Sequence, residues 1–353
     1  MDFLTLIGKL CDARGVSGYE DEAIEVAREY CKGFATVKED SMRNLYIFPD
    51  YNKGNRPLVM LDAHADEVGF IVQAIKPDGT LRFLPLGTWN ERSLASSKVQ
   101  IPTSSGYITG VISATPPHFL TEAQRNAPIT YESLSIDIGA TDAAQAKEWG
   151  IKIGAPVTPL SPFEYDENRG ILHGKAFDDR LGVACMLETL KRLEGAKLEV
   201  DLVGVVSTQE EVGVRGIVAV LDNIKPSAAI CFEGCPADDT FAAPYMVQDR
   251  LRGGVMLRHM DRSVICSPRF NAFAIDIAEN ENIKLQQAVR SGGGNNGAYI
   301  VSANGGTPVI VAGIPVRYIH TCNCIAAFED LESNIEFGVK VCEKLNEKAI
   351  ASF

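Results

Sequence analysis

The stretch Leu202-Val-Gly-Val-Val-Ser-Thr-Gln-Glu-Glu211 decides the fold, because a short apolar run leads directly into two adjacent glutamates. Such a run is typical of a strand that is buried on both faces of a sheet. Three further apolar runs end in ionisable side chains in the same way: Pro57–Leu61 before His64 and Asp66, Ala228–Phe232 before Glu233, and Pro308–Ala312 before the loop with His320. Ligands of open α/β sheets bind beyond the carboxyl ends of the strands, so we predict one shared site there.

Helical segments separate these strands and complete the fold class. Ser17-Gly-Tyr-Glu20 has the spacing of a capping box, and apolar positions follow it at helical intervals up to Gly33. Two more helices are predicted, over residues 178–193 and 331–345. Alternating strands and helices predict an α/β fold, here a three-layer sandwich with a mixed sheet.

Residues 71–160 follow a different pattern, in which short strands of alternating polarity are separated by turn sequences. Asp78-Gly79 and Ser105-Gly106 are typical of hairpin turns, and the runs Leu81–Pro85 and Lys98–Ile101 lie beside them. We therefore predict a main domain of residues 1–70 and 161–353 that is interrupted by a β-rich domain of residues 71–160, built as a barrel or a PDZ-like unit.

Composition argues against two classes of partner. The 353 residues carry a net charge of −12, which leaves no basic surface to neutralise phosphates, so neither nucleic acid nor a membrane is expected as a partner. Four charged side chains among the first 15 residues interrupt the apolar stretch that a secretory signal needs. The nine cysteines are scattered without a repeating frame, as in a reducing compartment, and we predict a cytoplasmic protein.

The side chains at the predicted sheet edge are of the types that hold divalent cations. Imidazole and carboxylate ligands suit zinc, cobalt or manganese, and one carboxylate can join two ions because it has two oxygens. In His64-Ala-Asp66 the carboxylate can orient the imidazole. Asp178 and Asp179 open a predicted helix, where one carboxylate can face a metal and the other can pair with Arg180 or with free amides.

Glu210 and Glu211 are the most informative pair in the sequence. Neighbouring side chains at a strand end point to different sides, so one can bind a metal while the other accepts a proton from a bridging water molecule. Carboxylates at strand ends also form buried ion pairs, and for any single one of these residues a structural role is an equal alternative. Five carboxylates in one crevice, however, repel one another unless cations are present. The set therefore predicts two divalent metal ions per subunit.

Four motifs occur in order along the chain: Asp62-Ala-His-Ala-Asp-Glu-Val-Gly69, Gly174-Lys-Ala-Phe-Asp-Asp-Arg-Leu-Gly182, Thr208-Gln-Glu-Glu-Val-Gly213 and Arg317-Tyr-Ile-His320. Together they resemble the co-catalytic di-metal aminopeptidases, a family that includes glutamyl aminopeptidases and the tetrahedral (TET) peptidases. The resemblance covers nearly the full length of the chain. Some relatives are labelled endoglucanases, but glycosidases need a carboxylate pair across a sugar subsite rather than a metal cluster.

The resemblance implies an enzyme that hydrolyses N-terminal residues from peptides by means of a hydroxide bridging two metal ions. It also implies that the β-rich domain makes dimers, which in this family often assemble into dodecamers. The implied roles of the site residues are these: His64, Asp178 and Glu233 hold one ion, Asp178, Glu211 and His320 hold the other, Glu210 is the general base and then the general acid, and Asp66 orients His64.

Two departures from the family pattern are visible. Glu233 stands where the family frequently has aspartate, and related sites tolerate its longer side chain. Asn295 and Asn296 follow three glycines where the family usually has threonine and aspartate, which removes a charge near the expected substrate pocket. Two alternatives therefore stay open, namely a catalytically silent relative with a peptide-binding or assembly role, and a di-metal amidohydrolase that acts on acylated amino acids.

Overall fold

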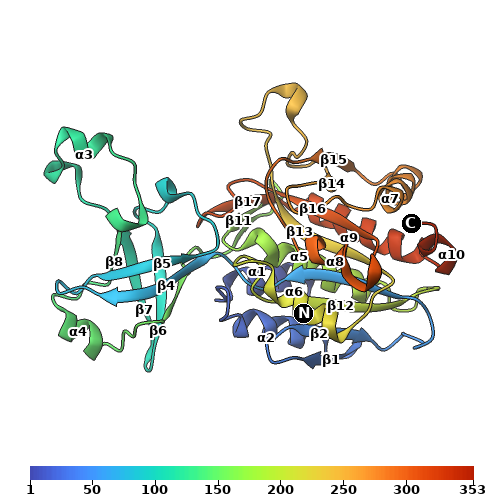
Figure 1. Ribbon diagram of the computed structural model, residues 1–353, viewed down its shortest axis with the longest axis horizontal. Coiled ribbons are helices and arrows are strands. Elements are labelled where there is room, and N and C mark those ends of the chain that lie inside the picture. Colours follow the sequence, from blue (N-terminus) through green and yellow to red (C-terminus); the bar gives the residue numbers. More distant parts are fainter.

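The structure, a computed structural model, describes residues 1–353, and a β-barrel projects from one side of a large α/β sandwich (Figure 1). The sandwich is built on an eight-stranded sheet of order β1-β2-β12-β3-β13-β16-β14-β15. Its strands are β1 (Ala35–Glu39), β2 (Leu45–Pro49), β3 (Leu58–His64), β12 (Asp201–Ser207), β13 (Ala228–Pro236), β14 (Val255–Met260), β15 (Leu285–Val289) and β16 (Val309–Val316). β12, β3, β13 and β16 are parallel neighbours, whereas β2 and β14 flank them in antiparallel pairing, so the sheet is mixed as predicted.

Helices cover both faces of this sheet, because its central strands are apolar on both sides. On β3, for example, Val59 and Leu61 belong to one core cluster and Met60 to another. The first face is covered by α1 (Phe3–Asp12), α2 (Asp21–Cys31), α5 (Phe177–Arg192), α7 (Pro268–Asn280) and α9 (Phe328–Lys344). The second is covered by α6 (Arg215–Asn223) and α8 (Gly297–Ile300). This arrangement confirms the predicted three-layer sandwich.

The inserted strands close into a barrel of order β4-β5-β8-β7-β6-β9. They are β4 (Gly69–Ile75), β5 (Leu81–Leu86), β6 (Lys98–Thr103), β7 (Gly106–Ser113), β8 (Ser135–Asp137) and β9 (Pro156–Pro159), with the short helices α3 (Glu122–Asn126) and α4 (Ala143–Glu148) between them. Asp78-Gly79 and Ser105-Gly106 connect antiparallel neighbours, as their turn chemistry predicts. The barrel has its own core cluster of 18 buried residues, which supports the proposal that residues 71–160 form a separate domain.

Two smaller parts complete the sandwich. β10 (Glu164–Asp166), β11 (Ile171–Gly174) and β17 (Cys324–Ala327) form a three-stranded sheet, and α10 (Glu347–Ile350) lies near the carboxyl terminus. No helix combines the length and the apolar content that a crossing of the bilayer requires. All nine cysteines are free and buried.

The predicted capping box at Ser17–Glu20 is wrong. α2 begins at Asp21, and Glu20 precedes it without a side-chain bond to the helix amides. The Ser17 hydroxyl donates instead to Asp66, and the Glu20 carboxylate accepts from the amide of Gln209, so both side chains point away from the helix that they were expected to cap.

Strand register brings the predicted site residues to one edge of the sheet. Ser207 at the end of β12 pairs with His64 at the end of β3, and Glu233 on β13 pairs with Gly313 on β16. The loop from β16 to β17 then returns His320 to the same edge, and α5 starts beside β13. Residues that lie up to 256 positions apart in the sequence therefore meet in space.

Candidate active site

The carboxyl edge of the sheet encloses a cavity of about 750 Å³. Only one of its 16 lining residues, Ile319, is hydrophobic. Five of the predicted site residues line this cavity, namely Asp178, Glu210, Glu211, Glu233 and His320. His64 and Asp66 lie behind them and are almost fully buried. The cavity is therefore polar and strongly charged, unlike the apolar pockets that bind most small molecules.

A first group of possible metal ligands consists of His64, Asp178 and Glu233, whose ligand atoms all lie within 4.8 Å of one another. Nε2 of His64 is 3.2 Å from Oδ1 of Asp178. The three side chains come from different elements, since His64 ends β3, Asp178 opens α5 and Glu233 lies on β13.

A second group consists of Asp178, Glu211 and His320, within the same limit of 4.8 Å. Nε2 of His320 is 3.2 Å from Oδ2 of Asp178 and 3.2 Å from Oε1 of Glu211. Asp178 belongs to both groups, and each of its two oxygens faces a different imidazole. A carboxylate in this position can join two cations that lie side by side.

The electrostatics of these side chains fit divalent cations. Burial raises the pKa of the Glu233 carboxyl well above its usual range, and the carboxylates of Asp178 and Asp179 raise it further. Although burial opposes it, contacts with carboxylates raise the pKa of both His64 and His320. Oε1 of Glu211 is buried without a hydrogen bond, although Nε2 of His320 is near. Imidazole and carboxylate donors of this kind suit zinc, cobalt or manganese.

Glu210 lies beside the two groups of possible metal ligands but forms no hydrogen bond or ion pair with an imidazole. Burial and the neighbouring carboxylates of Glu211 and Asp66 raise the pKa of Glu210 to about 8. A carboxyl group with such a pKa can take up a proton and release it again near neutral pH, which is what general base and general acid catalysis requires.

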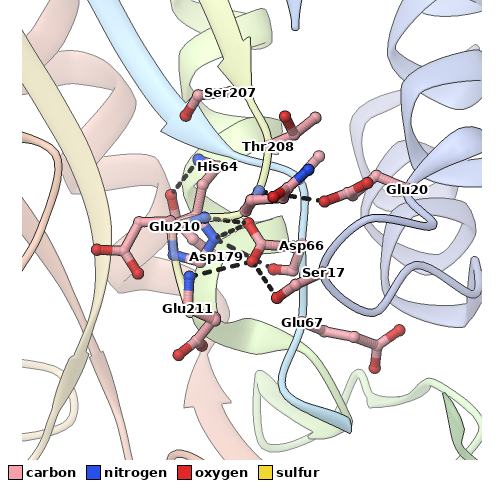
Figure 2. A network of polar contacts seen from close by, with 12 residues as sticks. Ser17, Glu20, His64, Asp66, Glu67, Asp179, Ser207, Thr208, Glu210 and Glu211 are labelled. Atoms are coloured by element: carbon pink, nitrogen blue, oxygen red, sulfur yellow. Dashed lines mark hydrogen bonds and ion pairs between the residues drawn. The ribbon is translucent and has the colours of Figure 1, made fainter. Parts of the chain in front are cut away.

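Two buried aspartates hold the residues around them in place. Asp66 lies between several partners in Figure 2: its carboxylate accepts from the amides of Glu210 and Glu211 at 2.9 and 3.0 Å. Nδ1 of His64 is 3.1 Å from the carbonyl oxygen of Asp66 and 3.4 Å from its carboxylate. Asp179 follows Asp178 across a cis peptide bond and accepts from the amide of His64 at 3.1 Å. Asp66 is therefore placed to orient the His64 ring, and Asp179 the His64 backbone.

Asp179 also accepts from the amides of Gly182 and Gly234, at 3.1 and 2.9 Å. The prediction that one carboxylate of this pair uses free helix amides agrees with these contacts. Arg180 does not pair with Asp179 but donates to backbone carbonyls, including those of Leu10 and Ala65.

Some residues beside the site were not expected from the sequence. Asn44 accepts from the amide of Thr208 at 2.9 Å, and Ser17 and Glu20 reach the same turn from the amino-terminal segment. Each of these partners lies more than 45 positions from the residue that it contacts, and no local pattern reports such contacts.

Asn295 and Asn296 are buried and do not line the cavity. Nδ2 of Asn296 donates to Asp62 and to the hydroxyl of Ser207, both at 2.7 Å. An aspartate in this position would face the carboxylate of Asp62, so an amide suits this chain. Asn295 and Asn296 follow Gly292–Gly294, which do line the cavity, so the expectation that they alter the charge near the pocket stays a prediction.

The chain is similar to known aminopeptidases in sequence and in fold. A family model described as M42 glutamyl aminopeptidase matches residues 46–337. The chain is 31% identical to the glutamyl aminopeptidase of Lactococcus lactis over 99% of both chains. Its fold is similar to that of a TET aminopeptidase from a marine sediment thaumarchaeon, with a TM-score of 0.96, 32% identity and 99% of both chains covered. It also resembles the Pyrococcus horikoshii TET1 peptidase, described as assembling into a tetrahedron or a large octahedral shell, with a TM-score of 0.87, 27% identity and 98% and 100% coverage.

Proposed function

The chain belongs to the M42 glutamyl aminopeptidase family and is a peptide hydrolase, and we propose that it removes residues from the amino terminus of peptides with two divalent cations bound at the sheet edge. The main support for this proposal is the position of Asp178, whose two oxygens face the imidazoles of His64 and His320. A shared carboxylate between two imidazoles is the ligand arrangement that a pair of neighbouring cations needs.

The ligands of the two ions follow from the two groups of side chains. His64, Asp178 and Glu233 hold one ion, and Asp178, Glu211 and His320 hold the other. Zinc, cobalt and manganese all match these donors. When bound, such a pair of cations polarises the peptide carbonyl and lowers the pKa of water enough for attack near neutral pH.

The protein side chains move the proton and position the substrate. Glu210 accepts a proton from the attacking water molecule and passes it to the leaving amine, because its raised pKa lets it exist in both forms. Asp66 keeps His64 in the orientation that presents Nε2 to the cavity. We expect a preference for free amino termini over blocked ones, because a free α-amine can serve as a further ligand of one cation.

We further propose that the cavity prefers an acidic N-terminal side chain. Arg258, Arg262 and Arg290 line its wall. Arg258 pairs with Asp261 and Arg290 with Asp238, both at 2.7 Å, but Arg262 is exposed and forms no ion pair. An unpaired guanidinium binds a carboxylate in a charge-assisted pair and repels a lysine or arginine side chain.

We also propose that the protein forms oligomers. The barrel domain is exposed on one side of the sandwich, and we propose that it pairs with a second copy of the chain in the cytoplasm (Figure 1). The dodecamer found for a TET1 relative supports further assembly of such dimers. Light scattering coupled to size exclusion should then give twelve times the chain mass of 38.3 kDa, and a monomer would contradict this part.

A screen of aminoacyl-p-nitroanilides tests the central activity. The protein is stripped with a chelator, resupplied with zinc, cobalt or manganese, and tested with free and amino-blocked substrates side by side. We expect turnover of free-amine substrates only, fastest with glutamate or aspartate. Turnover of acylated amino acids would favour an amidohydrolase, and no turnover with any metal would favour a silent relative.

A further inference from the structure

The segment Ser17–Glu20 does not form the capping box that its sequence predicts, and it has no part in the reaction proposed above. It lies just before α2 and packs against the turn that follows β12 (Figure 2). Ser17 and Glu20 are 5% and 1% exposed, so their polar groups are buried inside the protein rather than solvated. Buried polar groups in folded proteins nearly always form hydrogen bonds with specific partners.

The partners are the backbone amides next to the catalytic glutamates. Oε1 of Glu20 accepts from the amide of Gln209 at 3.1 Å and from that of Gly18 at 2.7 Å. The hydroxyl of Ser17 donates to Oδ2 of Asp66 at 2.6 Å. The same oxygen of Asp66 accepts from the amide of Glu211. Ser17 and Glu20 therefore reach the same turn along two routes, one direct and one through Asp66.

Three successive amides, of residues 209, 210 and 211, thus donate to the two buried carboxylates of Glu20 and Asp66. The amide of Thr208, one position earlier, donates to Asn44. The amides of residues 208–211 therefore all donate to side chains of other segments. The carbonyls of residues 208–210 accept from the amides of residues 213–216, so the backbone that carries Glu210 is held both from within the turn and from outside it.

The turn needs such support because of its backbone conformation. Gln209 has a φ of 54°, in the left-handed region, which is a strained conformation for a residue other than glycine. Strained residues keep such a conformation only where surrounding contacts impose it. Without the acceptor on Glu20, the amide of Gln209 would lose its side-chain partner, and we expect the strained backbone at this residue to be held less firmly.

Burial of the Glu20 side chain is unfavourable for the stability of the fold. The Glu20 carboxylate accepts from backbone amides rather than from a charged side chain, and Asp66 is a second carboxylate nearby. Burial of a carboxylate beside another one lowers the stability of the fold, and its hydrogen bonds to these amides offset part of that cost.

We propose that Ser17 and Glu20 are positioning residues, which fix the turn of residues 209–211 and thereby hold the Glu210 carboxylate at its working distance from the substrate. This inference rests on the proposed role of Glu210 in proton transfer. A displacement of about 1 Å in a catalytic group can cost on the order of a hundredfold in rate.

Steady-state kinetics of Glu20→Ala, Glu20→Gln and Ser17→Ala test the proposal in the metal-loaded enzyme. In Glu20→Ala and Ser17→Ala we expect kcat to fall about 10-fold to 100-fold while KM and bound metal stay within about threefold of the wild type. Glu20→Gln keeps an oxygen that accepts from the amide of Gln209, so it should restore kcat to within about threefold.

A matched control is Asp201→Ala, at the opposite end of β12. Asp201 is 4% exposed and accepts from three backbone amides, those of Lys53, Gly54 and Arg56, so the substitution is of the same kind. It should lower stability but leave kcat unchanged. The proposal is overturned if Asp201→Ala lowers kcat as much as Glu20→Ala, or if Glu20→Gln is as impaired as Glu20→Ala.

Hydrogen exchange gives a second readout that does not depend on activity. The peptide covering residues 207–216 should exchange faster in Glu20→Ala than in the wild type, and Asp201→Ala should leave it unchanged. Unaltered exchange of this peptide in both Glu20→Ala and Ser17→Ala overturns the proposal. If the wild type itself turned over no peptide, the proposed function would fail, and exchange alone would then decide whether these residues hold the turn.

Discussion

Glu210 and Glu211 are neighbours of the same type in different surroundings. Glu211 lies 3.2 Å from His320, whereas Glu210 forms no hydrogen bond or ion pair with an imidazole, and burial and adjacent carboxylates raise its pKa to about 8. Only one of the two is therefore free to exchange a proton. The fixed backbone between them makes this difference possible, since each amide donates to a different oxygen of Asp66.

The first prediction concerns the proton acceptor. Glu210→Gln should lower kcat by about 100-fold to 10,000-fold, because a glutamine side chain cannot take up the proton. Metal content, measured by elemental analysis, should not change. Glu199→Gln makes the same change at an exposed position and should have wild-type kinetics. Full activity of metal-loaded Glu210→Gln would contradict the role assigned to this residue.

The second prediction concerns specificity. Arg262→Glu should reverse the preference between glutamyl and lysyl p-nitroanilides, shifting the ratio of their kcat/KM values by about 10-fold or more, since it replaces an attractive charge by a repulsive one. The exposed Arg269 lies outside the cavity, so Arg269→Glu changes the net charge equally and should leave the ratio alone. Equal ratios in both variants would show that the unpaired arginine does not contact the substrate.

At the scale of elements, the start of α5 is fixed by its direct contact with β13. A Cβ atom on Gly234 would lie 2.8 Å from Cα of Asp178 and 3.1 Å from the carbonyl oxygen of Phe177. Strand and helix backbones touch here because glycine leaves no side chain between them. The position of the shared ligand Asp178 therefore depends on a residue that is not itself a possible metal ligand.

Gly234→Ala should consequently weaken metal binding by about 10-fold or more, because the strand would push Asp178 out of place. Titration with cobalt, followed by absorbance, measures this affinity. In the control Gly338→Ala on α9, the new Cβ would lie 2.9 Å from the Phe232 ring, so this variant crowds the core as well. The control should lose stability but bind metal normally. Equal metal affinities in the two variants would argue against this account of Asp178.

Local sequence patterns predicted the elements better than the contacts between them. Apolar runs gave the central strands, and Asp78-Gly79 and Ser105-Gly106 gave the hairpins of the barrel, because both patterns report on a few consecutive residues. Ser17-Gly-Tyr-Glu20 misled for the same reason. Its spacing is that of a capping box, but its partners Asp66 and Gln209 lie 49 and 189 positions away. Contacts between a site and side chains far away in the sequence produce no periodic pattern, so the sequence does not predict them.

At the scale of the whole molecule, the fold gathers negative charge that only cations can balance well. Four carboxylates, those of Asp178, Glu210, Glu211 and Glu233, face one cavity. Metal ions bind this arrangement in the folded state and not in the unfolded chain, so they should stabilise the protein. The net charge of −12 adds to this effect through general repulsion.

Removal of the metals should therefore lower the melting temperature by several degrees, since each site adds about 2.7 kcal/mol at a hundredfold excess of metal over Kd. Calorimetry with and without chelator measures the change. Glu233→Gln removes one buried carboxylate, and in the metal-free state this variant should be at least as stable as the wild type. A metal-free wild type that melts at the same temperature as the loaded protein would contradict the proposed sites.

Anomalous diffraction from a crystal soaked in zinc or cobalt would locate the two metal ions. We expect two neighbouring peaks, one among His64, Asp178 and Glu233 and the other among Asp178, Glu211 and His320. A crystal without either peak at saturating metal, in which the carboxylates and imidazoles remain paired with one another, would contradict it.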